Sequence, residues 1–125
     1  KRFEKEVDIF LEISQVGDWE AGNLLHSHGI DIAVDLMAHT KGARVGLSAL
    51  KPAPLVVNYL GYPGTMGSEF TDYALVDANS VPPENALFFS EKIVYLPHLY
   101  QANDYNVSTP YCMEQSGGCQ NILKE

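Results

Sequence analysis

Apolar and polar residues alternate in short blocks along the chain, and five of the apolar blocks are rich in β-branched and aromatic residues. Such blocks, bounded by Gly, Pro, Asn or Asp, are typical of β-strands. The pattern therefore predicts strands at residues 7–13, 30–36, 55–60, 73–76 and 92–96. Since no apolar run reaches 18 residues, no membrane span is expected.

Three segments between these blocks have the spacing or the terminal residues of helices. The first is expected at 18–27, with Asp18 as its N-cap and Gly29 ending it in a left-handed conformation. Its apolar side is formed by residues at helical spacing, which are Ala21, Leu24, Leu25 and His28. A short helix is expected at 43–50, and a third, opened by prolines, at 82–90.

Strands that alternate with helices indicate an α/β domain with a mostly parallel sheet, and residues 7–36 have the order of a β-α-β unit. In such sheets, ligands bind beyond the carboxyl ends of the strands. Two loops occupy that position in the sequence, at residues 37–44 and 61–67. These loops are where the sequence predicts a binding site.

The first loop combines an imidazole, a hydroxyl and two cations directly after a buried strand. Its polar side chains are His39, Thr40, Lys41 and Arg44. If the next helix begins near Ala43, its first N–H groups add to an anion-facing arrangement, and an imidazole can exchange a proton near neutral pH. The alternative is a solvated loop whose Lys and Arg pair with Asp31 or Asp35.

The second loop is rich in glycine. It reads Leu60, Gly61, Tyr62, Pro63, Gly64, Thr65, Met66 and Gly67. Glycine permits unusual backbone shapes and the close approach of a ligand to the main chain. The string is neither GxGxxG nor a GxxxxGK[ST] phosphate-binding loop, because no Lys follows its last Gly. The alternative is a plain turn.

Charge and the remaining polar residues argue against other classes of site. Eight basic and sixteen acidic residues give 8 − 16 = −8, which disfavours binding to a nucleic acid. His26 and His28 are two residues apart and do not share a helix face as metal ligands would, so no metal site is expected. Asp72 and Asp77 could form an acid/base pair, but capping and turn roles are the commoner alternative.

Several short motifs follow one another in an order that resembles the catalytic region of the O-linked N-acetylglucosamine transferases and their SPINDLY-like relatives. The string LGYPGTMG at 60–67 is specific, and the ordered set is more so. The other motifs are HTKGAR at 39–44, KPAP at 51–54, Asp72-Tyr73, Glu91-Lys92 and Leu96-Pro97-His98. The resemblance covers residues 1–107.

This resemblance implies a GT-B architecture, in which two Rossmann-like lobes face a nucleotide-sugar cleft. Residues 1–107 would be part of the N-terminal catalytic lobe, and residues 108–125 a divergent, flexible tail. The second lobe, and the tetratricopeptide repeats that usually precede the first, are missing from the sequence. We therefore expect the chain to be an internal piece of a longer protein.

The resemblance also implies transfer of N-acetylglucosamine from UDP-N-acetylglucosamine to Ser or Thr of acceptor proteins, in the cytoplasm and also in the nucleus, without a cofactor. Two alternatives stay open: a SPINDLY-like protein O-fucosyltransferase that uses GDP-fucose, and a noncatalytic interaction module. The family's catalytic His lies upstream of this segment, and the Lys that stabilises the departing diphosphate lies downstream. The chain alone is therefore expected to be inactive.

Leu60 and Gly61 match family positions near the donor sugar, and the polar residues of the first loop match a loop that borders donor and acceptor. The predicted donor- and acceptor-binding residues are His39, Thr40, Lys41, Arg44, Leu60, Gly61, Tyr62, Pro63, Gly64 and Thr65. His39 is the one candidate for a catalytic group. Where the family usually has Gly, Arg, Gln and Trp, this chain has Ala38, Lys51, Val56 and Tyr59. The alanine is expected to change how its loop sits, and the valine puts one polar contact in doubt.

Overall fold

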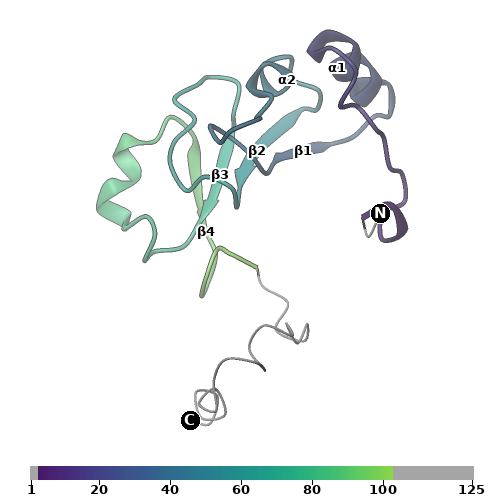
Figure 1. The fold of residues 1–125 in the computed structure, drawn as a ribbon. Helices are drawn as coiled ribbons and strands as arrows, with labels where there is room; N and C mark the ends of the chain where they lie inside the picture. The colour runs from purple at the N-terminus through teal and green to yellow at the C-terminus, as the bar shows by residue number, and fades with distance from the viewer. Residues whose placement is uncertain (1–2, 103–125) are drawn as a thin grey trace, which may run out of the picture.

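The computed structural model describes residues 3–102. Within them, four strands form one sheet in which every neighbouring pair is parallel (Figure 1). The strands are β1 (Ile32–Asp35), β2 (Leu55–Tyr59), β3 (Tyr73–Val76) and β4 (Lys92–Tyr95). Their order in the sheet is their order in the sequence. The prediction of an α/β domain with a mostly parallel sheet is confirmed.

The register of the sheet places the carboxyl ends of the four strands along one edge. Asp35, the last residue of β1, lies beside Asn58 near the end of β2, and Val76 at the end of β3 lies beside Tyr95. Because parallel strands run the same way, the loops that follow β1 and β2 leave the sheet at neighbouring points. The two loops singled out in the sequence therefore start side by side.

Helices α1 (Asp18–Ser27) and α2 (Val45–Ala49) lie beside each other (Figure 1). Gly22 of α1 is buried at their contact, and a Cβ added there would stand 3.0 Å from Leu50 Cδ1. The absence of a side chain at Gly22 is what allows the two helices to approach this closely.

The predicted ends of α1 are partly correct. Gly29 adopts φ +62°, the left-handed conformation expected after a helix. The N-cap, however, is Gly17, and Asp18 is the first helical residue, with no side-chain bond to the helix N-terminus. The carboxylate of Asp18 is instead held by Arg44, 2.8 Å from its Nε. A long-range charged partner thus displaces the local capping bond.

One predicted helix takes a different form. The segment 82–90 forms a 3-10 helix, η2 (Pro83–Phe88), rather than an α-helix. Its end is closed by a bond from the Phe89 N–H to the Ala86 carbonyl, which has the i to i−3 spacing of a tight turn. A second 3-10 helix, η1 (Phe3–Lys5), lies near the N-terminus.

The predicted strand at 7–13 is wrong, because this segment is in no strand of the described sheet. Its β-branched and aromatic residues favour an extended chain, but a strand also needs a neighbour to exchange hydrogen bonds with. Ile9 is 62% exposed, so the segment does not pack as a sheet member would. Hydropathy alone does not supply the missing partner.

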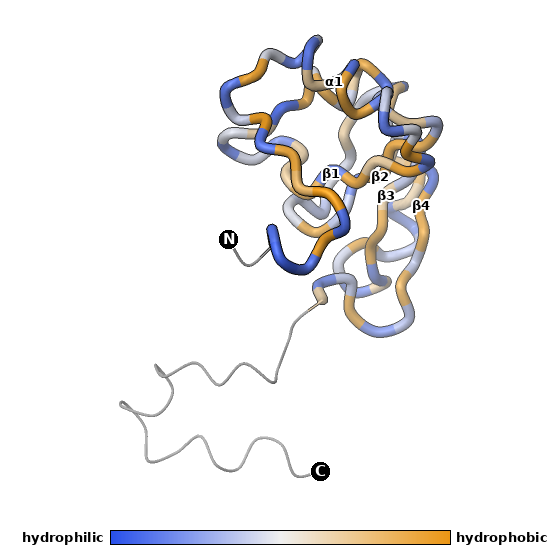
Figure 2. Tube along the Cα trace, turned by 90° about the vertical axis from the view of Figure 1, so that its right-hand side faces the viewer, coloured by the Kyte–Doolittle hydropathy of each residue, from blue (hydrophilic) through white to orange (hydrophobic). Residues whose placement is uncertain are grey.

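The small hydrophobic core lies on the β3–β4 side of the sheet, and hydrophobic residues follow the strands and the segment before α1 (Figure 2). The core consists of Ala74, Val76 and Val81, with Phe89 and Ile93 packed against it. On β1, by contrast, Ile32 is 54% exposed and Val34 49%. In the part of the chain that is described, no helix is long and apolar enough to cross a bilayer.

Candidate functional site

The two predicted loops are in contact beyond the ends of β1 and β2. His39 of the first loop lies with its Nε2 3.1 Å from the carbonyl oxygen of Met66 in the second. Its ring also meets Tyr62 edge to face, with the ring centroids 5.6 Å apart and the planes at 84°. The structure therefore brings together residues that are 23 to 27 positions apart in the sequence.

The bond to Met66 assigns a proton to one nitrogen of His39. A carbonyl oxygen only accepts, so the Nε2 of His39 must carry the hydrogen that it donates. The other ring nitrogen, Nδ1, is then the one that can accept a proton or a hydrogen bond from a ligand. His39 is exposed, which leaves that nitrogen accessible.

The start of the second loop packs against the end of β1. A Cβ added to Gly61 would stand 2.1 Å from the carbonyl oxygen of Leu36 and 3.3 Å from the Cα of Met37. The space at Gly61 is therefore filled by the chain itself rather than left for a ligand. Leu60 just before it has φ +75°, a conformation that is uncommon for residues other than glycine.

Ala38 adopts the backbone conformation for which glycine is usual. Its φ is +48° and it is fully buried. The N–H groups of Ala38 and Met37 donate to the Oδ1 of Asp35, at 3.0 and 2.8 Å. These two bonds hold the turn after β1, so the alanine has not removed the left-handed shape from this loop.

The side chain of Asn58, in β2, is hydrogen-bonded to the middle of the second loop. Its side chain is buried, and its Nδ2 donates to the carbonyl oxygens of Tyr62, at 3.3 Å, and Gly64, at 3.1 Å. From the sequence, Asn58 was identified only as a strand residue. The usable signal was an amide inside an otherwise apolar strand, since a buried amide requires partners.

Glu91, directly before β4, holds the far end of the loop. Its buried carboxylate accepts a bond from the Thr65 hydroxyl at 2.7 Å and a short bond from the Met66 N–H. From the sequence, Glu91 was identified only as part of the Glu91-Lys92 motif. An acidic residue next to a core strand was the signal for a buried acceptor.

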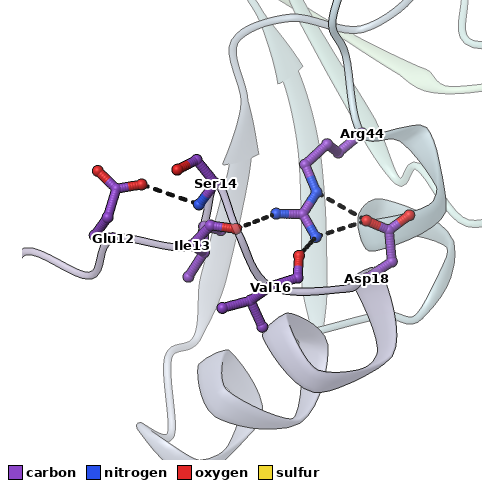
Figure 3. A network of polar contacts seen from close by, with 6 residues as sticks. All are labelled: Glu12, Ile13, Ser14, Val16, Asp18 and Arg44. Carbon is purple, nitrogen blue, oxygen red and sulfur yellow. Dashed lines mark hydrogen bonds and ion pairs between the residues drawn. The ribbon is translucent and has the colours of Figure 1, made fainter.

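The polar residues of the first loop do not all face the second loop. Figure 3 shows the guanidinium of Arg44 pointing at Asp18 and at the carbonyl oxygens of Ile13 and Val16, each within 2.8 Å. Arg44 thus ties the N-terminal segment to the loop before α2. Thr40 donates to its own loop, at the Met37 carbonyl, 2.6 Å away.

The alternative pairing with Asp31 or Asp35 is wrong for Arg44, whose carboxylate partner is Asp18. Lys41 is exposed and has no ion-pair partner within residues 3–102. Asp35 is instead used by backbone N–H groups and by the hydroxyl of Ser48, 3.2 Å away. Within residues 3–102, Lys41 is thus the cation of this loop that remains available to a ligand.

Asp72 and Asp77 do not form an acid/base pair. Lys51 Nζ lies 2.7 Å from Asp72, and this bond, with the Val56 N–H, holds the pKa of Asp72 below its usual value. At the end of β3, the buried carboxylate of Asp77 accepts from backbone N–H groups. Those of Tyr100, Ser80 and Asn79 lower its pKa. The turn interpretation of Asp77 is confirmed.

A cavity of about 360 Å³ opens between β1, α1 and α2, beside the first loop. Its walls are mainly apolar, and its polar groups come from Asp35, Arg44 and Ser48, which already bond within the protein. Residues of the second loop do not line it. No cluster of three metal-ligating side chains occurs in the part of the chain that the structure covers.

Comparison with known proteins gives a consistent set of matches. The model of glycosyl transferase family 41 matches residues 1–117. This match extends past residue 107, where the sequence analysis placed the end of the catalytic lobe, and that domain boundary stays a prediction. The tail at 108–125 lies outside the described residues.

Among curated relatives, the probable UDP-N-acetylglucosamine–peptide N-acetylglucosaminyltransferase SEC of Arabidopsis thaliana is 38% identical over 84% of this chain and 11% of its own length. The corresponding SPINDLY protein of Oryza sativa subsp. japonica is 30% identical over 77% of this chain and 10% of its own length.

A solved structure, that of a mutant of the Thermobaculum terrenum O-GlcNAc transferase, superimposes with a TM-score of 0.76 and 31% identity. The match covers 79% of this chain and 19% of that one. The chain thus spans about a tenth of the length of the curated relatives and about a fifth of the solved chain.

Proposed function

Because the chain belongs to glycosyl transferase family 41, we propose that it forms part of the catalytic lobe of a protein O-N-acetylglucosaminyltransferase. The donor is UDP-N-acetylglucosamine and the acceptor is a Ser or Thr hydroxyl of another protein. The names of the relatives, UDP-N-acetylglucosamine–peptide N-acetylglucosaminyltransferases, support this donor and a peptide acceptor. The donor-binding second lobe and a repeat domain belong to the rest of the protein, which this chain does not include.

The observation that carries the proposal is the contact between the two loops at the carboxyl edge of the sheet. His39 bonds to Met66 and packs on Tyr62, so the loops form one surface. Parallel α/β sheets bind nucleotides and sugars at this edge, where loops from adjacent strands converge. We place the donor sugar and the acceptor hydroxyl over this surface.

Within that surface the residues have different tasks. Lys41 supplies a positive charge toward the diphosphate, because its ammonium is exposed and unpaired within residues 3–102. His39 offers Nδ1 to the acceptor or the sugar. Arg44 shapes the loop without touching substrate, because each of its three guanidinium nitrogens already bonds to Asp18 or to a backbone carbonyl oxygen.

The reaction sets a limit on what this chain does alone. The acceptor oxygen forms a bond to the anomeric carbon, the bond from that carbon to the diphosphate oxygen breaks, and the acceptor proton passes to a base or to solvent. Stabilising the departing diphosphate takes several aligned donors, and Lys41 is one group. We therefore expect binding of donor by this chain, and transfer only in the complete protein.

A binding titration tests the proposal. Thermal unfolding of the 125-residue chain is measured with UDP-N-acetylglucosamine, UDP and GDP-fucose at millimolar concentrations. A ligand that binds only the folded chain raises the midpoint temperature of unfolding. At a ligand concentration of 100 times Kd, it adds about 2.7 kcal/mol to the free energy of unfolding. We expect a shift with UDP-N-acetylglucosamine that is larger than with UDP and absent with GDP-fucose. A shift with GDP-fucose alone would identify the fucosyltransferase alternative.

A pair of charge variants makes the titration specific to the site. Lys41→Met removes the unpaired cation of the first loop and is expected to reduce the shift. Lys5→Met removes an exposed cation of η1, which belongs to neither loop, and should leave the shift unchanged. Equal effects of both variants would argue for a nonspecific charge effect.

One feature supports the alternative of a noncatalytic interaction module. Ile32 and Val34 of β1 are about half exposed, and parallel sheets are usually covered on both faces. In that case a partner would bind the open face, and the loop edge would bind neither donor. The same titration separates the two, since a module gives no shift with either nucleotide sugar.

A further inference from the structure

Glu91 is a buried carboxylate whose hydrogen-bond partners lie on the glycine-rich loop and beside it. It is 5% exposed, and its acceptor atoms meet the Thr65 hydroxyl, the Met66 N–H and the Ser90 hydroxyl. In the described part of the chain, no Lys or Arg forms an ion pair with it. Burying a carboxylate is costly unless hydrogen bonds replace its water, so these three bonds are what allow Glu91 to stay buried.

The hydroxyl of Thr65 relays that interaction into the loop backbone. It gives its hydrogen to Glu91, and its oxygen accepts the N–H groups of Gly67, at 3.0 Å, and Ser90, at 3.2 Å. A hydroxyl has one hydrogen and two lone pairs. Thr65 thus uses its hydrogen and both of its lone pairs. Its oxygen can accept both N–H groups in this arrangement because Glu91 accepts the hydrogen.

The other end of the loop is held separately. Asn58 takes the carbonyl oxygens of Tyr62 and Gly64, and His39 donates to that of Met66. Carbonyl groups of the loop therefore turn toward the protein. The N–H groups of Gly64 and Thr65, between the two anchors, find no acceptor within residues 3–102.

We propose that Glu91 is a positioning residue for donor binding: by holding Thr65 and Met66, it fixes the Gly61–Gly67 loop in the shape that receives the nucleotide sugar. The inference rests on the proposed function, because it assumes that this loop faces the donor. Glu91 itself does not touch the substrate. Its contribution is to keep the backbone donors of the loop aligned before the ligand arrives, which reduces the cost of ordering the loop on binding.

The chemistry of the site requires a carboxylate and not an amide. In Glu91→Gln, the amide oxygen can still accept the Met66 N–H, but the amide nitrogen then points a hydrogen at Thr65. Thr65 already accepts two N–H groups, so it has no lone pair for a third donor. One bond is lost although the side chain keeps its size.

The test measures the Kd for UDP-N-acetylglucosamine by titration calorimetry on the 125-residue chain and on four variants. Glu91→Gln and Thr65→Val each remove the Glu91–Thr65 bond from one side, and the third variant combines them. Glu69→Gln is the matched control, since Glu69 is an exposed carboxylate of the same connection between β2 and β3. Circular dichroism confirms that each variant is folded at the temperature of the titration.

We expect Glu91→Gln to weaken binding by about tenfold, in line with the loss of one well-formed hydrogen bond. Thr65→Val also removes the two bonds that Thr65 accepts from Gly67 and Ser90, so it should weaken binding at least as much. The double variant should lose little more than Thr65→Val alone, because the bond between Glu91 and Thr65 is already absent there. Glu69→Gln should bind as the unchanged chain does. A variant that is merely less stable, but folded during the titration, would not show this pattern.

Amide hydrogen exchange without ligand gives a second readout. Glu91→Gln and Thr65→Val should speed exchange at Met66 and Gly67 by about tenfold or more, as local opening becomes easier. If Glu91→Gln is not folded, Thr65→Val carries the test alone.

The outcomes separate the two proposals. Unchanged Kd in the folded variants overturns the positioning role and leaves the proposed function intact, and so does additive loss in the double variant. If the unchanged chain shows no binding of UDP-N-acetylglucosamine, the proposed function fails and the positioning role for this donor fails with it. Unchanged exchange at Met66 and Gly67 overturns the positioning role whatever the chain binds.

Discussion

Gly61 packs directly against the backbone of Leu36, so closely that a Cβ on the glycine would stand 2.1 Å from the Leu36 carbonyl oxygen. The contact joins the end of β1 to the start of the loop that follows β2. Both groups are backbone, so neither can move aside by rotating a side chain. The junction of the two candidate loops is therefore a fixed point of the fold.

Gly61→Ala is expected to destabilise the chain by about 1–3 kcal/mol, the usual cost of forcing an extra methyl into a packed site. The measurement is the free energy of unfolding from urea denaturation. Gly64→Ala is the control in the same loop, because the three atoms nearest to a Cβ there belong to the outer part of the Tyr62 side chain, at 2.6 to 2.8 Å. That ring is 37% exposed and can swing away. Equal losses for both variants would contradict the fixed junction.

Arg44→Lys is expected to lower the free energy of unfolding by about 1–2 kcal/mol. The guanidinium fork reaches the Asp18 carboxylate and two carbonyl oxygens at once, whereas an ammonium cannot meet all three in this geometry. The loss is modest because solvent screens this contact: the Arg44 side chain is 28% exposed and that of Asp18 44%.

Lys41→Met provides the comparison, since it removes a cation of the same loop that has no ion-pair partner within residues 3–102. Its effect on the free energy of unfolding should stay within about 0.5 kcal/mol. If Lys41→Met cost as much as Arg44→Lys, charge rather than the three-way contact would explain the loss.

Local pattern was sufficient to predict the strands that lie in the sheet and the long helix. The apolar blocks at 55–60, 73–76 and 92–96 carry enough β-branched and aromatic residues to identify β2, β3 and β4 within about one residue. The helix 18–27 follows from its apolar spacing. These elements form because what they need is encoded within a few residues of each other.

Partners far away in the sequence decided the rest. Residues 7–13 have strand composition, yet no strand of the described sheet pairs with them. Asp18 has the character of an N-cap, yet Arg44, 26 positions away, takes its carboxylate. In both cases a local preference was correct as chemistry and was overridden by tertiary contacts.

In the candidate site, too, some features could be predicted from local sequence, and others depend on contacts between distant residues. The rule that ligands bind beyond the carboxyl ends of parallel strands pointed to each of the two loops, and the structure shows that they are in contact. The sequence could not show which polar residues support the second loop, because Asn58 and Glu91 reach it from two different strands or their ends. Nor could it show that Arg44 turns toward the N-terminal segment.

Asp77→Asn is expected to lower stability at pH 7 and to make it less sensitive to acid. The pKa of Asp77 is lowered chiefly by the Tyr100 N–H and then by Ser80 and Asn79, so the folded chain prefers the ionised form. Its contribution is fully present above the ordinary aspartate pKa of about 3.9 and is lost as pH falls through the lower folded pKa.

The difference in urea midpoint between the unchanged chain and Asp77→Asn should therefore be constant from pH 7 to about pH 5 and shrink as the pH falls to about 3. Asp72, whose pKa is also lowered, titrates in both proteins and cancels in the difference. A difference that grew at low pH would reverse the sign of this argument.

Two substitutions of His39 separate its structural bond from its ability to exchange a proton. Gln places an amide N–H where the imidazole Nε2 lies, so His39→Gln keeps a donor for the Met66 carbonyl but cannot take up a proton. Phe keeps a ring against Tyr62 and removes the donor. If the loop contact is what binding needs, the Kd of UDP-N-acetylglucosamine should rise several-fold for His39→Phe and change little for His39→Gln.

Transfer by the complete protein then reports the other property. If Nδ1 of His39 takes the acceptor proton, His39→Gln should lower kcat by about 100-fold or more while donor binding is kept, as for loss of a general base. If kcat is also kept, the His39–Met66 bond is structural and the proton leaves by another group. Calorimetry on the chain and steady-state kinetics on the complete protein, measured side by side, decide between these outcomes.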